Sequence, residues 1–79
     1  MPPQKKKMLR RKIAQAFQHE QRTVEIMLEL AEIFGEHHKD YEEYFQAIGQ
    51  CSLVVMGFIQ DVAVKAWGFW PDNIETWLK

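Results

Sequence analysis

The sequence predicts an all-α protein, built as a long antiparallel helical hairpin followed by a short C-terminal helix. Apolar residues recur at spacings of three, four and seven along two long stretches, which is the period of an amphipathic helix. Gly35 separates these stretches, and Gly68 and Pro71 follow the second. No Asn-Gly or Asp-Gly turn and no sustained alternation of apolar and polar residues favours strands. With 79 residues, the chain forms one domain at most.

The first helix is predicted over residues 8–34, after a basic N-terminal arm at residues 1–7. Residues 8–79 then form a single helical domain. The apolar stripe of this helix contains Leu9, Ile13, Phe17, Val24, Met27 or Leu28, Ala31 and Phe34. Gly35 suits the position after a helix end, where the backbone turns left-handed. A short loop then makes the next helix an antiparallel neighbour.

The second helix is predicted over residues 39–66, with acidic residues favouring its N-terminus. Its stripe contains Tyr41, Tyr44 or Phe45, Ile48, Cys51 or Ser52, Val55, Ile59, Val62 and Ala66. We expect Cys51 to be a core residue on this stripe. Gly49 and Gly57 each cost a helix about 1 kcal/mol relative to alanine, so we expect them to mark places where another helix comes close.

A third helix is predicted over residues 71–78, because Pro71 suits the first position of a helix. Four aromatic residues lie at this end of the chain, namely Trp67, Phe69, Trp70 and Trp77. We expect these rings to cap the open end of the hairpin, packing on the start of the first helix, with Arg10 or Arg11 on a ring face. The alternative is an aromatic anchor for a partner.

The apolar surface exceeds what two facing helices bury. The second helix is apolar over more than half its circumference, and the first carries a second stripe. We therefore expect a homodimer that forms a four-helix bundle; the alternatives are a different protein partner or a third helix that covers the excess. The candidate interface residues are Ile26, Leu30, Ile33, Leu53, Val54, Met56, Phe58, Trp67 and Trp70.

Charge is unevenly distributed along the chain, although its net value is only −1. Residues 1–22 contain seven basic residues and one acidic residue, whereas residues 23–79 contain three lysines and ten acidic residues. The candidate phosphate or nucleic-acid contacts are Lys5, Lys6, Lys7, Arg10, Arg11 and Lys12. A basic cluster of this kind neutralises phosphates; the alternative is a solvated tail.

No catalytic, metal or cofactor site is predicted. His37 and His38 are adjacent, which matches no zinc signature. Residues 44–60 carry no charge, but polar residues interrupt them, so a buried helix is favoured over a membrane span. No secretory signal is visible, and we expect a cytoplasmic protein.

These observations predict a small, non-enzymatic protein–protein interaction, adaptor or regulatory module that acts through an apolar helical face. The alternative is a nucleic-acid-associated protein that binds the phosphate backbone through basic N-terminal arms.

Overall fold

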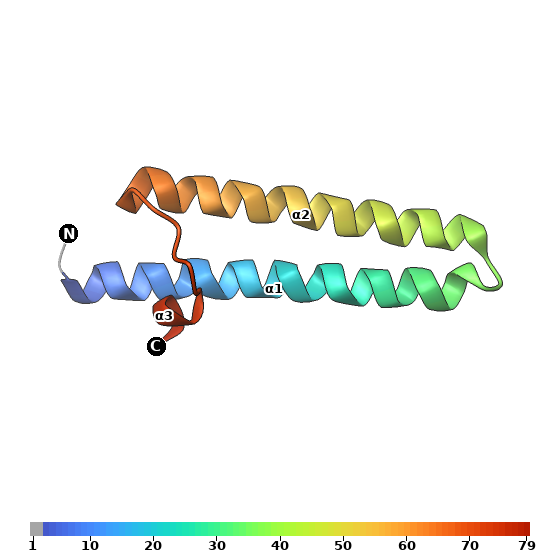
Figure 1. The fold of residues 1–79 in the computed structure, drawn as a ribbon, viewed down its shortest axis with the longest axis horizontal. Coiled ribbons are helices and arrows are strands. Elements are labelled where there is room, and N and C mark those ends of the chain that lie inside the picture. Colours follow the sequence, from blue (N-terminus) through green and yellow to red (C-terminus); the bar gives the residue numbers. More distant parts are fainter. Residues whose placement is uncertain (1–2) are drawn as a thin grey trace.

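Two long helices lie side by side and antiparallel in the computed structural model, which describes residues 3–79. Helix α1 spans Pro3–Gly35, α2 spans Lys39–Trp67, and α3 spans Glu75–Leu78. The molecule is a rod of 53 × 21 × 18 Å (Figure 1). The predicted all-α hairpin with a short C-terminal helix is confirmed. Helix α1 begins before residue 8, so Lys5, Lys6 and Lys7 of the predicted arm belong to it. Met1 and Pro2 of that arm lie outside the described residues.

The turn between α1 and α2 is made by three residues and uses no left-handed glycine. The carbonyl of Phe34 accepts hydrogen bonds from the backbone N–H groups of His37 and His38, at 3.1 and 2.6 Å. These bonds satisfy the end of α1 while Gly35 stays helical, so the prediction of a left-handed Gly35 is wrong. Among residues 3–79 the glycine with positive φ is Gly68, at 86°, and it ends α2 by donating to the carbonyl of Val64.

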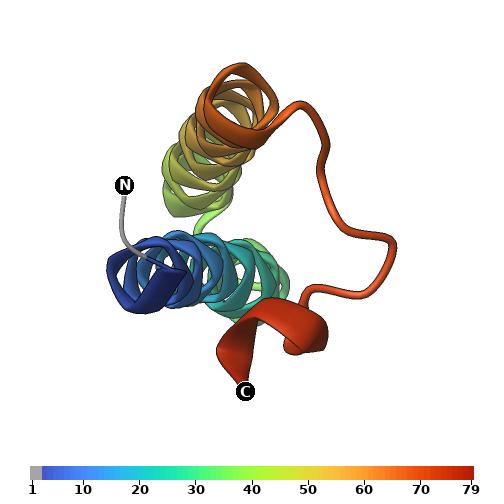
Figure 2. The ribbon, with the colours of Figure 1, turned by 90° about the vertical axis from the view of Figure 1, so that its left-hand side faces the viewer.

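The segment between α2 and α3 is longer than the sequence predicts. Pro71 is buried within this linker rather than opening a helix, and α3 begins four residues later. Asn73 sets that start: its side-chain Oδ1 accepts a hydrogen bond from the backbone N–H of Glu75, and its carbonyl accepts one from the hydroxyl of Thr76. Such local bonds favour a turn over continued helix. Helix α3 packs against α1, and the linker runs along one flank of the hairpin (Figure 2).

Small side chains form the contact between α1 and α2. Ala14 and Ala31 on α1, and Gly49, Ser52 and Ala63 on α2, are the buried residues of the two helices. A Cβ atom placed on Gly49 would lie 3.6 Å from Cβ of Met27, so the expected close approach at Gly49 is confirmed. The same expectation for Gly57 is wrong, because nothing lies within 4 Å of a Cβ placed there.

Because small residues form this contact, most of the predicted stripe of α2 faces outward. The inward residues, spaced at three and four, are Phe45, Gly49, Ser52, Met56, Ile59 and Ala63. Phe45, Ser52 and Ile59 of the predicted stripe do face inward. Its other members lie about one position away from the inward residues, which is about 100° of rotation. Tyr44 is therefore 70% exposed, and Val62 is exposed. Cys51 is also exposed, so its prediction as a core residue is wrong.

Candidate interaction surface

Few of the large apolar side chains are buried within a single chain. Among residues 3–79, the buried apolar side chains of the core are Ala14, Ala31, Ala63 and Trp77. Trp77, at 7% exposure, is the one large member of that group. Most of the large aliphatic and aromatic residues of α2 are exposed. The hairpin thus presents apolar surface that its own packing leaves in water.

The exposed apolar residues of α2 form one continuous stripe. It contains Tyr41, Tyr44, Ile48, Cys51, Val55, Phe58 and Val62. Their spacing alternates between three and four residues, which aligns them along one side of a helix. Phe58 is 62% exposed. The stripe lies beside the inward seam of small residues, about a quarter turn around α2.

Helix α1 adds apolar residues on the same flank of the hairpin. Ala16 and Val62 line one shallow apolar hollow together with Ile13 and Ile59, which shows that these two positions flank the same side. Residues seven positions apart lie on the same side of a helix, so Leu30, two such repeats after Ala16, also lies on this flank of α1. We define the open face as this α2 stripe together with Ile26, Leu30 and Ile33 of α1.

The linker and α3 occupy the other flank of the hairpin. In Figure 2 they lie on one side of α1 and α2, and the opposite side carries no further segment of residues 3–79. A second hollow on the linker side is more polar, because Gln46 and Gln50 line it beside Leu28 and Leu53. The open face is therefore both the more apolar flank and the uncovered one.

The structure separates the nine candidate interface residues into three groups. Ile26, Leu30, Ile33 and Phe58 belong to the open face. Leu53 lies on the opposite flank, Val54 is exposed away from the seam, and Met56 points toward α1 and is half-buried. Trp67 and Trp70 are half-buried and pack against the core cluster of Ala14, Ala63 and Trp77. Ile48 and Val55, and Tyr44 as the alternative to Phe45, were predicted on the inward stripe of α2 and are instead exposed.

The aromatic residues close the open end of the hairpin, as the sequence predicts. Trp77 contacts the rings of Trp67, Phe69 and Trp70, with centroids 5.5–5.6 Å apart. Trp70 also packs on Phe17 at 4.8 Å. These contacts pull α3 onto the start of α1 and use the rings inside the fold.

Arg10 belongs to this aromatic end. Its guanidinium lies 5.5 Å from the ring centroid of Trp67, 6.0 Å from Phe69 and 5.7 Å from Trp77. Its Nε atom is buried and has no hydrogen-bond partner. The expectation of an arginine on a ring face is confirmed, and Arg10 is thereby less accessible to a phosphate than its neighbours.

The other candidate phosphate contacts remain in water. Lys5, Lys6, Lys7, Arg11 and Lys12 are exposed. Lys6, Lys7 and Arg10 line a hollow together with Lys79 and Thr76 from the end of the chain. No local sequence pattern points to Lys79, because only the return of α3 onto α1 brings it there.

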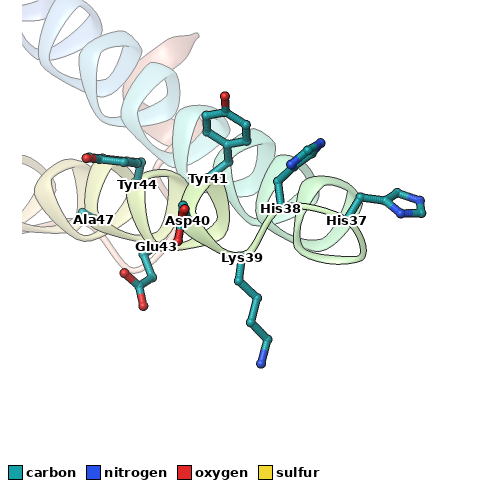
Figure 3. Close-up of a pocket in the computed structure, with 8 residues that line it drawn as sticks. All are labelled: His37, His38, Lys39, Asp40, Tyr41, Glu43, Tyr44 and Ala47. Carbon is teal, nitrogen blue, oxygen red and sulfur yellow. The ribbon is translucent and has the colours of Figure 1, made fainter.

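A third hollow lies at the turn between α1 and α2. His37, His38, Lys39 and Tyr41 line it with neighbouring residues of α2. Figure 3 shows that their side chains point in different directions rather than toward a common centre. Within residues 3–79, no group of three or more His, Cys, Asp or Glu side chains is placed to hold a metal ion.

Helix α2 is long and apolar enough to cross a membrane by length and composition alone. Only 17% of its most apolar window is buried in the hairpin. A single helix of this kind is weak support for a membrane span, since a core helix of a soluble protein passes the same test.

Comparison of the chain with protein-family models, curated proteins and solved structures found no match.

Proposed function

We propose that this chain is a non-enzymatic protein–protein interaction module, whose open face packs against the open face of a second copy to form a four-helix bundle. The observation that carries this proposal is the uncovered apolar stripe of α2. In a four-helix bundle each helix contacts two neighbours about a quarter turn apart. Helix α2 has two such seams, of which α1 occupies only one.

The surface area of the single chain also supports a partner. A folded monomer of 9.4 kDa exposes about 5,000 Å² by the usual scaling with mass. This chain exposes 6042 Å². The excess is about the area that one subunit contributes to a standard protein–protein interface, roughly 800 Å². A dimer through the open face would bring the buried apolar surface to an ordinary level.

The test is the mass in solution of the full chain and of two matched variants. We expect light scattering at micromolar concentration to give twice 9.4 kDa for the unmodified chain. Phe58→Glu places a charge on the open face and should give a monomer. Leu53→Glu is the control, because Leu53 is an apolar residue of the same helix with similar exposure, 53%, on the opposite flank. A monomeric unmodified chain, or equal dissociation by both variants, would contradict the proposal.

Binding of the nucleic-acid phosphate backbone is a second candidate function. The observation that favours it is the exposure of Lys5, Lys6, Lys7, Arg11 and Lys12 at one end of α1, with no acidic residue between positions 3 and 12. Binding of this type weakens steeply as salt is raised. Fluorescence anisotropy with a labelled duplex, for the unmodified chain and for a variant with Lys5, Lys6 and Lys7 changed to Gln, tests this function.

A membrane partner is an outcome that the same preparations detect. Co-sedimentation with anionic vesicles, without formation of a dimer, would assign the open face to lipid rather than to protein. Cytoplasmic localisation stays a prediction from the sequence.

A further inference from the structure

We infer that the two copies pack with their hairpins pointing in opposite directions, so that the basic end of each subunit lies beside the acidic end of the other. This inference rests on the proposed function and specifies the partner's orientation. It concerns the symmetry of the assembly, the residues at its centre and the ion pairs at its two ends.

The charges of the rod are concentrated at opposite ends. Residues 3–12 hold six basic residues and no acidic residue. The fold adds Lys65 and Lys79 to this end, together with acidic residues, among them Asp61 one turn before Lys65 and Glu75 of α3, and the end remains strongly basic. At the other end, residues 29–43 hold six carboxylates and a single lysine. Figure 1 shows that these two segments occupy opposite halves of the hairpin.

Two symmetric dimers place the open faces together. In one, a two-fold axis runs along the rod and each α2 packs on the partner's α1, with like ends adjacent. In the other, the axis crosses the rod and each α2 packs on the partner's α2, with opposite ends adjacent. Both make all neighbouring helices antiparallel, so helix packing alone does not choose between them. Charge favours the dimer with opposite ends adjacent, because like charges placed together across an interface are costly and opposite charges are favourable.

The length of the stripe fixes the centre of this dimer. Tyr41 packs on Phe34 and His38 within its own hairpin, so the rest of the stripe, from Tyr44 to Val62, is available to the partner. This part is centred at position 53, and the two-fold axis therefore crosses α2 between Cys51 and Val55. Cys51 of one copy then lies opposite Val55 of the partner subunit. In the dimer with like ends adjacent, the pairing of Met27 with Gly49 within each hairpin instead implies that Cys51 faces the region of Ile26 of the partner subunit.

Disulfide trapping distinguishes these arrangements. Each variant retains Cys51, which is exposed, and is oxidised with copper–phenanthroline before non-reducing electrophoresis. Val55→Cys should convert most of the protein to a covalent dimer. Leu53→Cys is the control, because position 53 lies at the same height along the rod on the opposite flank, and it should give at most the level of the unmodified chain.

The third variant, Ile26→Cys, reports the opposite result. Covalent dimers from Ile26→Cys, with none from Val55→Cys, would overturn the inference while leaving the dimer of the proposed function intact. A monomer by light scattering would overturn both. Rapid covalent dimers from all three variants would indicate random collisions and would also overturn the inference, because an ordered interface protects one flank.

Discussion

Gly57, within α2, and Gly68, just after its end, contribute to stability in opposite ways. Gly68 adopts a φ of 86°, which costs an L-residue about 1–2 kcal/mol. Gly57 is helical, with open space around its Cα, so alanine there gains about 0.5–1 kcal/mol from backbone entropy. We expect Gly68→Ala to destabilise the protein and Gly57→Ala to stabilise it, in urea denaturation at one protein concentration. Shifts of the same sign in both variants would contradict this account.

Arg10 illustrates a residue whose type suggests one role and whose position gives it another. Its guanidinium lies among three aromatic rings, an interaction that contributes about 1–2 kcal/mol when partly desolvated. We expect Arg10→Ala to reduce stability by about that amount and to change the near-ultraviolet circular dichroism of the tryptophans. The adjacent Arg11 is exposed, so Arg11→Ala should change stability by less than about 0.5 kcal/mol. Equal effects of the two substitutions would argue against the ring contacts.

At the scale of the element, the sequence predicted both long helices but misplaced the inward side of α2. Periodicity selects a side only when one side is apolar, and α2 is apolar over more than half its circumference. Side-chain volume then decides, because Gly49, Ser52 and Ala63 let α1 approach closely, whereas the wider Tyr44 and Ile48 do not. Ile48 and Val55 were therefore predicted on the inward stripe and found on the surface, whereas of the two alternatives Tyr44 and Phe45 it is Phe45 that faces inward. Ile26, Leu30, Ile33 and Phe58, which the sequence predicts as interface residues, belong to the open face, and their role in an interface stays a prediction.

The C-terminal element depends on one side chain. Helix α3 has four residues, which is too short to be stable alone, and Trp77 holds it by contacts with three rings. Trp77→Ala should cost about 3–5 kcal/mol, as for other large core side chains, and should detach α3. Phe69 is about half exposed, so Phe69→Ala should cost clearly less. Urea denaturation measures both, and hydrogen exchange at residues 75–78 reports the detachment directly. A cost for Trp77→Ala no larger than that for Phe69→Ala would contradict this role.

At the scale of the whole molecule, the rod exposes more surface than is usual for a monomer of its mass, and its two ends carry opposite charge. These two properties have different consequences. The apolar stripe supplies the affinity of the proposed dimer, and the charges supply its direction. The sequence reveals the charge asymmetry directly, but it does not reveal that Lys65 joins the basic end. That grouping requires the antiparallel fold.

A charge-exchange experiment tests the direction of the dimer without any cysteine. Lys5 and Lys12 at one end of α1, and Glu29 and Glu36 at the other, are exposed and lie along the edge of the open face, each pair seven residues apart. We expect Lys5→Glu with Lys12→Glu, and separately Glu29→Lys with Glu36→Lys, each to weaken dimerisation about tenfold at low salt. This size corresponds to the loss of a few surface ion pairs of about 0.2–1 kcal/mol each.

Mixing the two double variants should restore the affinity of the unmodified chain. In a heterodimer with opposite ends adjacent, the reversed acids of one subunit meet the reversed bases of the other, while the unchanged ends still meet each other. A dimer with like ends adjacent predicts a different result, because its unmodified form already places like charges together. Each double variant alone would then dimerise about as well as the unmodified chain, and the mixture would bind more tightly than the unmodified chain. The differences in dimer affinity between the unmodified chain, the two double variants and their mixture should disappear in 1 M salt, where screening acts over about 3 Å. Rescue on mixing that persists at that salt concentration would assign the effect to packing rather than to charge.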